Sequence, residues 1–118
     1  MSKTLTIFLT TTPFAHQNSY TALRLIDAAL DKGHTVNLFA SADGVHNFTV
    51  GQRAAGLPEI GPAFERLMQK GLHIELCGSC LSLRGIGRED ILPGSQPSAM
   101  KRLFGLMKNG DVFMTLGA

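Results

Sequence analysis

The chain has 118 residues and a formal net charge of +2, from 11 Lys and Arg against 9 Asp and Glu. The basic residues are dispersed and there is no Trp, so the basic stripe with interleaved aromatics that is typical of nucleic-acid binding is missing. No stretch approaches the roughly 18 apolar residues that a membrane-spanning helix needs. The apolar start of the chain also has no small-residue cleavage site. We therefore expect one cytoplasmic domain over residues 1–118, with no nucleic acid and no membrane as partner.

The composition is apolar for a small domain. Hydrophobic residues make up 44% of the chain and charged residues 17%, whereas a typical soluble domain has about 25% charged residues. Chains of this kind often cover part of their surface with copies of themselves, so we expect a homo-oligomer. Two cysteines are too few for a disulfide scaffold, which indicates thiols that are reduced at rest.

The start of the chain predicts a strand, a helix and a second strand. Residues 4–10 form a β-branched, apolar run of strand length, which a loop containing proline then breaks. A helix begins near Asn18 or Ser19, either of which can cap it, and ends at Gly33. Residues 35–40 predict the next strand.

The middle of the chain has the weakest pattern. Residues 41–44 follow the second strand as a loop, with Asp43 in an Asp-Gly turn pair. Residues 45–60 leave two alternatives open. One is a short helix over residues 45–48, and the other is a long surface loop, which the glycines and Pro58 favour.

The second half repeats the alternation of helix and strand. Pro62 suits the first turn of a helix that ends at Gly71, and residues 72–77 predict the third strand. Residues 87–97 are polar and punctuated by proline and glycine, which predicts a loop.

A last helix and strand complete this pattern. Ser98 can cap a helix that ends at Gly110, and residues 111–116 predict the final strand. Four apolar residues of this helix are expected to turn inward: Met100, Leu103, Phe104 and Met107.

A helix that ends in a glycine before a strand occurs three times, at Gly33, Gly71 and Gly110. This alternation favours a single α/β domain with a mostly parallel sheet and helices on both faces, a flavodoxin-like arrangement of three layers. In such sheets, reactive groups lie beyond the carboxyl ends of the strands. Cys77 occupies that position on the third strand.

Cys77 and Cys80 are the two cysteines of the chain, and both lie at the end of this strand. A free thiol has a pKa of about 8.5, so only a small fraction is ionised near neutrality. If residues 78–80 open a short helix, their unpaired N–H groups favour negative charge on the Cys77 sulfur, and Cys80 shares a face with it. Arg84 adds a cation if the segment bends back. The pattern thus predicts a reactive thiol site made of Cys77, Cys80 and Arg84.

Other interpretations of these residues stay open. Free cysteines are among the most buried residues, so the pair can be core filling. A structural zinc site needs four ligands, and His73 faces the same side as Cys77 but lies too far along the strand to chelate with it; we expect neither metal nor cofactor. His16 and His46 follow strands at the same edge and are candidates for proton transfer to a thiol. The threonine-rich loop over residues 10–12 resembles the phosphate cradle of a nucleotide- or flavin-binding module only loosely.

Four segments that span nearly the whole chain carry a recognisable combination of motifs. A cysteine closes the third strand, with Arg-Gly seven and eight residues later, matched by Cys77, Arg84 and Gly85. The other matching segments are the loop over residues 10–14, the Asp-Gly-Val segment within residues 41–45, and the last strand over residues 111–116. In these features the chain resembles the DsrE/DsrF-like family. Its Cys-x-x-Cys form followed by Arg-Gly-Ile is most similar to the YchN-type branch.

The resemblance implies a small α/β domain that assembles into a dimer or a ring, such as a trimer or hexamer. It also implies a persulfide carrier that takes sulfane sulfur on Cys77 from a donor protein and passes it to an acceptor protein. Cys80 adds a second thiol, which can attack a persulfide on Cys77, release sulfide and leave a disulfide. Two alternatives therefore remain, a dithiol–disulfide redox protein that uses Cys77 and Cys80, and a non-catalytic assembly subunit.

Overall fold

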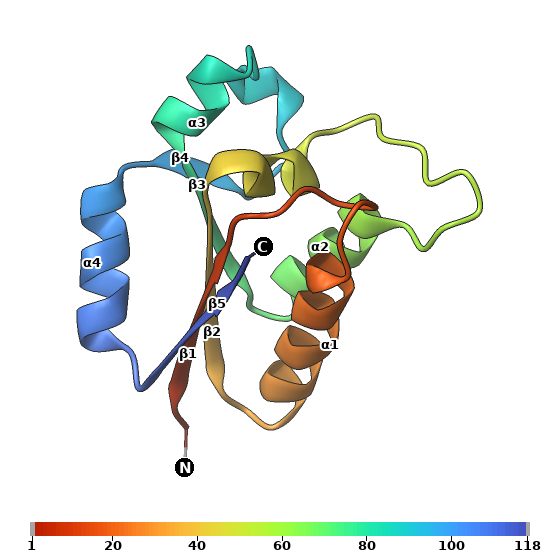
Figure 1. Cartoon of the computed structure of the whole chain (residues 1–118). Helices are drawn as coiled ribbons and strands as arrows, with labels where there is room; N and C mark the ends of the chain where they lie inside the picture. Colours follow the sequence, from red (N-terminus) through yellow and green to blue (C-terminus); the bar gives the residue numbers. More distant parts are fainter. Residues whose placement is uncertain (1, 118) are drawn as a thin grey trace.

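Five strands form one sheet in the order β4-β3-β2-β1-β5 (Figure 1). The structure is a computed structural model, and it describes residues 2–117. All four strand pairings are parallel, which confirms the predicted parallel sheet. The strands are β1 (Thr4–Leu9), β2 (Thr35–Ala40), β3 (His73–Cys77), β4 (Gln96–Ser98) and β5 (Val112–Leu116).

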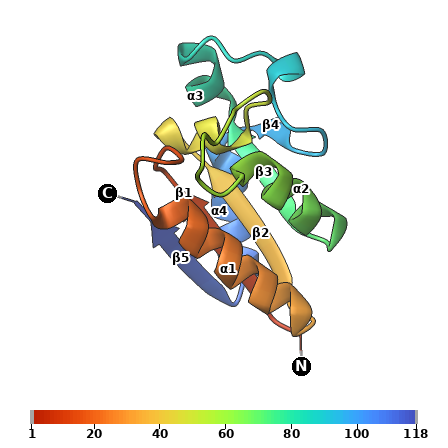
Figure 2. The same cartoon turned by 90° about the vertical axis from the view of Figure 1, so that its right-hand side faces the viewer.

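Helices cover both faces of the sheet, as predicted. The helices α1 (Asn18–Asp31) and α2 (Ile60–Gln69) lie on one face, and α4 (Met100–Asn109) lies alone on the other (Figures 1 and 2). Three short helices sit beyond the carboxyl ends of the strands, at the top of Figure 1: η1 (Ala42–Phe48), α3 (Gly78–Leu83) and η2 (Arg88–Asp90). Among the residues described, no helix is both long and apolar enough to cross a membrane.

The larger part of the core fills the space between the sheet and the α1–α2 layer. Alternate residues of the strands point into it, among them the fully buried Ile7 and Leu38. Ile26 of α1 packs on the same cluster, and Phe64 of α2 meets Phe48 of η1 with 4.7 Å between ring centroids. This packing fixes η1 against the end of the sheet.

The face under α4 has a much smaller apolar cluster. Of the four α4 residues predicted to turn inward, only Leu103 is buried, where it packs with Phe39 and Cys77. The prediction is wrong for Met100, Phe104 and Met107, which are 42%, 67% and 40% exposed. A lone helix on an open sheet face contacts it along a narrow stripe, so the flanks of its apolar side remain in solvent.

Some predictions of local structure are also wrong. Neither Asn18 nor Ser19 caps α1, because their side chains bond to Thr11 and to Asn47 instead. Ser98 does not cap α4, since its hydroxyl donates to Glu75. In each case a partner distant in sequence competes with the local cap.

The predicted loops are the other corrections. The segment predicted as a loop over residues 87–97 contains η2 and most of β4, a three-residue edge strand too short to show a periodic pattern. Residues 42–44, also predicted as loop, belong to η1. The two alternatives for residues 45–60 both occur, since η1 continues to Phe48 and residues 49–59 then run without helix or strand.

The α4 face also holds a buried carboxylate. Glu75 lies in β3 with a side chain 4% exposed, and it accepts hydrogen bonds from Arg102 Nη2 at 2.7 Å and Ser98 Oγ at 2.5 Å. His73 Nε2 lies 2.6 Å from Glu75 Oε2, the oxygen that also accepts from Arg102 Nη2. The bonds from Arg102 outweigh the cost of burial and, with those from Ser98 and His73, lower the pKa of Glu75 from 4.5 to about 2. This cluster ties β4 and α4 to β3.

Replacing Glu75 with Gln is expected to remove much of the acid sensitivity of the fold. Because the folded pKa is depressed, the ionised carboxylate stabilises the protein fully above about pH 5.5, and this contribution is lost as the pH falls toward 2. The shift corresponds to about 3 kcal/mol. We expect Glu75→Gln to lower the free energy of unfolding at pH 7 by about 2–3 kcal/mol and to flatten its decline in acid, measured by urea unfolding.

The matched control is Glu65→Gln, which alters an exposed carboxylate on α2. This variant is expected to stay within about 0.5 kcal/mol of the parent protein. Equal acid dependence in the two variants would contradict the role assigned to Glu75.

Candidate functional site

The candidate site forms where the carboxyl ends of β2 and β3 meet. These strands are parallel neighbours, so the residues that follow them lie side by side. The segment from Ser41 into η1 follows β2, and α3 follows β3 and carries Cys80 and Arg84. This arrangement joins residues 39 to 41 positions apart in the chain.

Cys80 is the better solvated of the two thiols. Its sulfur lies 3.1 Å from the backbone nitrogen of Ala42, which donates to it, and 3.5 Å from the hydroxyl oxygen of Ser41. Partial burial raises the pKa of the Cys80 thiol, but hydrogen bonds from Ser41, Cys77 and Ala42, with the charge of Arg84, outweigh it. The pKa of Cys80 therefore lies below its ordinary value, and the thiolate is favoured.

Cys77 has a different environment. It ends β3 as predicted, but it is only 5% exposed and packs with Phe39 and Leu103 beneath α4. The helix α3 does open at Gly78, although it is a single six-residue segment. The donor groups of the site gather around the Cys80 sulfur, and the Cys77 thiol is one of them.

Arg84 joins the two elements that carry these residues. Its Nε and Nη2 donate to Asp43 Oδ1 at 3.1 and 2.8 Å, and its Nη1 donates to the backbone oxygen of Cys80 at 3.1 Å. These contacts hold η1 against α3. The pairing with Arg84 also keeps the pKa of Asp43 below its usual range. Asp43, expected to be only a turn residue, is therefore the ion-pair partner of the predicted cation.

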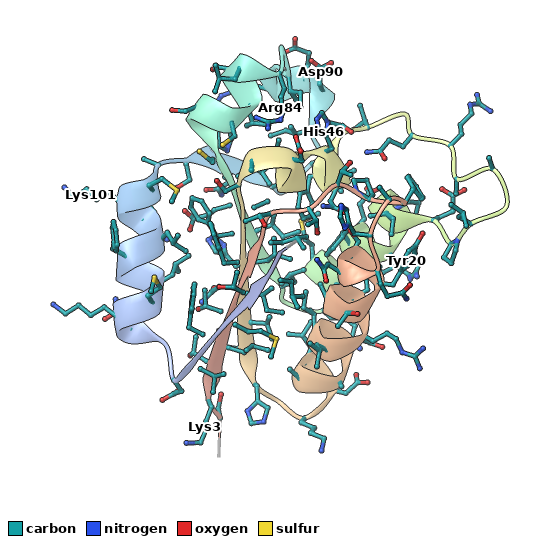
Figure 3. All side chains as sticks on the ribbon, viewed as in Figure 1. Lys3, Tyr20, His46, Arg84, Asp90 and Lys101 are labelled. Carbon is teal, nitrogen blue, oxygen red and sulfur yellow. The ribbon has the colours of Figure 1, made fainter. Side chains whose placement is uncertain are left out.

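The predicted histidines do not contact the thiols. Figure 3 shows His46 and Arg84 on the facing elements η1 and α3, and the hydrogen bond from Arg84, with a smaller contribution from His46, lowers the pKa of Asp43. His16 is exposed in the loop after β1, and His73 pairs with Glu75. Within residues 2–117, no three His, Cys, Asp or Glu side chains gather closely enough to hold a metal ion.

Asn47 anchors η1, and the sequence analysis did not identify it. It is fully buried, and its Nδ2 donates to the backbone oxygens of Thr11 at 2.9 Å and Gly44 at 2.8 Å. Ser19 of α1 donates to Asn47 Oδ1 at 2.5 Å. The one available signal was an amide between His46 and Phe48 and two residues after Val45, because a polar residue close to buried apolar residues needs buried partners.

Two backbone features bring η1 close to the sheet. Ala42 has φ of 52°, in the left-handed region that costs a non-glycine residue roughly 1–2 kcal/mol. Gly44 packs so tightly on the end of β1 that a Cβ atom there would overlap the Leu9 carbonyl group. The Ala42 amide is thereby fixed over the Cys80 sulfur.

The chain matches the model of the DsrE/DsrF-like family over residues 3–116. Two similar relatives have no known function. An uncharacterized protein of Methanopyrus kandleri (MK0008) is 30% identical over 91% of this chain and 88% of its own. An uncharacterized protein of Methanocaldococcus jannaschii (MJ0989) is 28% identical over 93% of this chain and 96% of its own.

Solved structures share the fold. The YchN protein from E. coli superposes with a TM-score of 0.90 and 23% identity, over 98% of this chain and all of that one. The protein of unknown function MTH1491 from Methanobacterium thermoautotrophicum gives 0.80 with 12% identity, over the same shares of the two chains. At these identities the likeness describes the fold alone.

Substituting Ala for Gly44 is expected to lift η1 away from the cysteines. The added methyl group overlaps backbone, so η1 must shift, which we expect to destabilise the fold by about 1–3 kcal/mol. The Ala42 donor then moves off Cys80, and the pKa of this thiol rises. The pH dependence of alkylation by iodoacetamide measures this as a shift to higher pH.

Gly105→Ala in α4 is the matched control. A Cβ atom there meets nothing within 4 Å, so the change is expected to stabilise the helix slightly and leave the alkylation profile unchanged. An unchanged profile in Gly44→Ala would contradict the positioning of Cys80 by η1.

Proposed function

We propose that this chain, which belongs to the DsrE/DsrF-like family, is a sulfur-transfer protein that carries sulfane sulfur as a persulfide on the Cys77–Cys80 pair. The observation that supports this most is a partly exposed sulfur, that of Cys80, with the Ala42 amide at 3.1 Å and the Ser41 hydroxyl at 3.5 Å. Such donors favour the thiolate, which is the nucleophilic form of cysteine. A persulfide anion at the same place needs the same donors.

The reaction requires only that one thiol of the pair accepts the sulfur. Its thiolate attacks the outer sulfur of a donor persulfide, a new S–S bond forms, and the donor leaves as a thiolate. The family resemblance assigns this role to Cys77. An acceptor thiolate then attacks the same outer sulfur, which restores the carrier thiolate. Sulfur donor and acceptor proteins are the partners that this cycle needs.

A dithiol–disulfide redox protein is the second candidate. It is favoured by the Cys-x-x-Cys spacing and by the Cys77 side chain being among the causes that lower the pKa of the Cys80 thiol, so the two thiols are neighbours. Attack of the pair on an external disulfide would give a Cys77–Cys80 disulfide and two external thiols. Counting free thiols across a glutathione redox series separates the two candidates. A redox protein loses two free thiols when its disulfide forms, whereas a carrier has both thiols free again at the end of each cycle.

Exposure of the protein to inorganic polysulfide at about pH 6 is expected to add sulfur to one thiol. Because a folded site that favours the thiolate reacts faster than an ordinary cysteine, we expect uptake about tenfold faster in the native protein than in the urea-unfolded chain. Intact mass before and after treatment with a reductant measures the added sulfur.

The unfolded chain contains the same two cysteines, so it controls for ordinary thiol reactivity. A variant with both Cys77→Ser and Cys80→Ser controls for sulfur bound elsewhere. Absence of added sulfur on the native protein, or equal rates in the folded and unfolded chains, would disprove a sulfur carrier.

We further propose that a second copy of the chain covers the apolar surface of α4 and β5. Phe104 and Met107 of α4 are exposed, and so is Phe113 of β5, an edge strand that pairs with β1 in the sheet. Exposed apolar residues beside an unpaired strand edge are typical of assembling chains. Sedimentation equilibrium is expected to give a multiple of the monomer mass, and Phe104→Lys is expected to lower it.

Leu25→Lys on α1 is the control for this test, because Leu25 is an exposed apolar residue on the opposite face of the sheet. It should leave the mass unchanged. A monomeric parent protein would rule out the assembly.

A further inference from the structure

The two cysteines of the site differ in exposure and in their hydrogen-bond partners. Cys80 is partly exposed and accepts hydrogen bonds from main chain and side chain, whereas Cys77 is 5% exposed and packs among apolar groups. The family pattern places the carrier at the first cysteine. The geometry favours the second.

We propose that Cys80, and not Cys77, is the thiol that accepts and carries the sulfane sulfur, and that Cys77 remains a reduced thiol beside it. This assignment rests on the proposed function and specifies which atom performs it. Ser41 and the Ala42 amide act as positioning groups that hold the sulfur anion.

Space and access favour Cys80. A persulfide on Cys77 would insert an additional sulfur atom between β3 and α4, where Cys77 touches Phe39 and Leu103 in a packed cluster. Cys77 is only 5% exposed, so a donor protein has little access to it. The Cys80 sulfur lies at the open edge of the sheet, beside the exposed Ala42.

Charge favours Cys80 as well. A persulfide is more acidic than a thiol, so the carried group is an anion near neutrality and needs donors or cations around it. At Cys80 these are the hydroxyl of Ser41, the Ala42 amide and the charge of Arg84. Cys77 has an apolar surrounding, and the Arg102 guanidinium on the same face of the sheet is already paired with Glu75. An anion there would be desolvated without donors or a cation to compensate.

The transfer step balances without a further reactant. The Cys80 thiolate attacks the outer sulfur of a donor persulfide R–S–SH, the S–S bond of the donor breaks, and Cys80–S–SH and R–S⁻ result. An acceptor thiolate takes the outer sulfur in the same way and returns Cys80 to its thiolate. No electron leaves the protein, so Cys77 does not change its oxidation state.

Single cysteine variants test the assignment. After exposure to inorganic polysulfide, we expect Cys77→Ser to keep at least half of the added sulfur of the parent protein, and Cys80→Ser to lose at least nine-tenths of it. Intact mass gives the extent of uptake, and fragmentation of the persulfide-bearing peptide gives the position.

The outcomes separate this assignment from the proposed function. Uptake by Cys80→Ser but not by Cys77→Ser would overturn the assignment and leave a sulfur carrier. Uptake by both variants would also overturn the assignment, because either thiol could then carry the sulfur. Uptake by neither variant while the parent protein reacts would overturn it too, because both thiols would then be needed. No uptake by the parent protein would instead remove the proposed function.

A measurement on the parent protein guards against variants that fold poorly. Iodoacetamide at limiting concentration and about pH 6 is expected to label Cys80 at least tenfold more than Cys77, because only the ionised and accessible thiol reacts. Preferential labelling of Cys77 would overturn the assignment without any substitution.

Ser41→Ala tests the positioning role. The titratable or charged groups around Cys80 are Cys77, Arg84, Asp43 and His46, and this variant leaves all of them in place. Loss of the hydroxyl removes one donor to the anion, so the alkylation profile of Cys80 should move to higher pH. The exposed Ser82→Ala on α3 is the control and should keep the parent profile. Equal profiles in the two variants would overturn the role of Ser41.

Discussion

The buried amide of Asn47 is the constraint on which the carboxyl edge of this protein depends. It joins α1 through Ser19, the segment after β1 through Thr11, and η1 through Gly44. Each of these partners is itself held by the core, and each would be left unsatisfied without Asn47, at a cost of about 1–3 kcal/mol per group. The path of the chain from Ser41 onward follows from this anchoring.

The sheet separates two kinds of environment around the cysteines. On the α4 face, Cys77 sits at the end of a strip that also contains Glu75, whose charge is neutralised by Arg102. Beyond the edge, Cys80 faces η1 and its donors. The short helix α3 follows β3 directly, so that Cys77 is buried at the end of the strand while Cys80, three residues later, reaches the donors of η1. Because Leu103 of α4 packs on Cys77, a shift of α4 would also change the packing beneath the site.

The sheet and its main helices were predictable because hydrophobic periodicity repeats over many residues and glycines mark the boundaries. Cys77, Cys80 and Arg84 were predictable as a group, since a strand end in a parallel sheet is a common place for chemistry. The partners that define their roles were not. The contacts of Asp43 with Arg84 and of Ala42 with Cys80 join segments 41 and 38 residues apart, and a main-chain donor has no sequence signature. The exposed flank of α4 shows another limit. Hydrophobic periodicity predicts which side of a helix is apolar, but it does not predict how much of that side the sheet covers.

The donor that Ala42 offers is a main-chain amide, and this affects which substitutions the site tolerates during evolution. Every residue except proline has the same N–H group, so drift at this position leaves the chemistry intact as long as the backbone keeps its left-handed turn. Glycine or asparagine would adopt that turn with less strain. Selection at position 42 therefore acts on the backbone conformation, which Asn47 anchors, and not on the side chain of Ala42. Relatives that keep the site are best identified by the geometry of this segment, because residues other than proline keep the donor at position 42 wherever they adopt the left-handed turn.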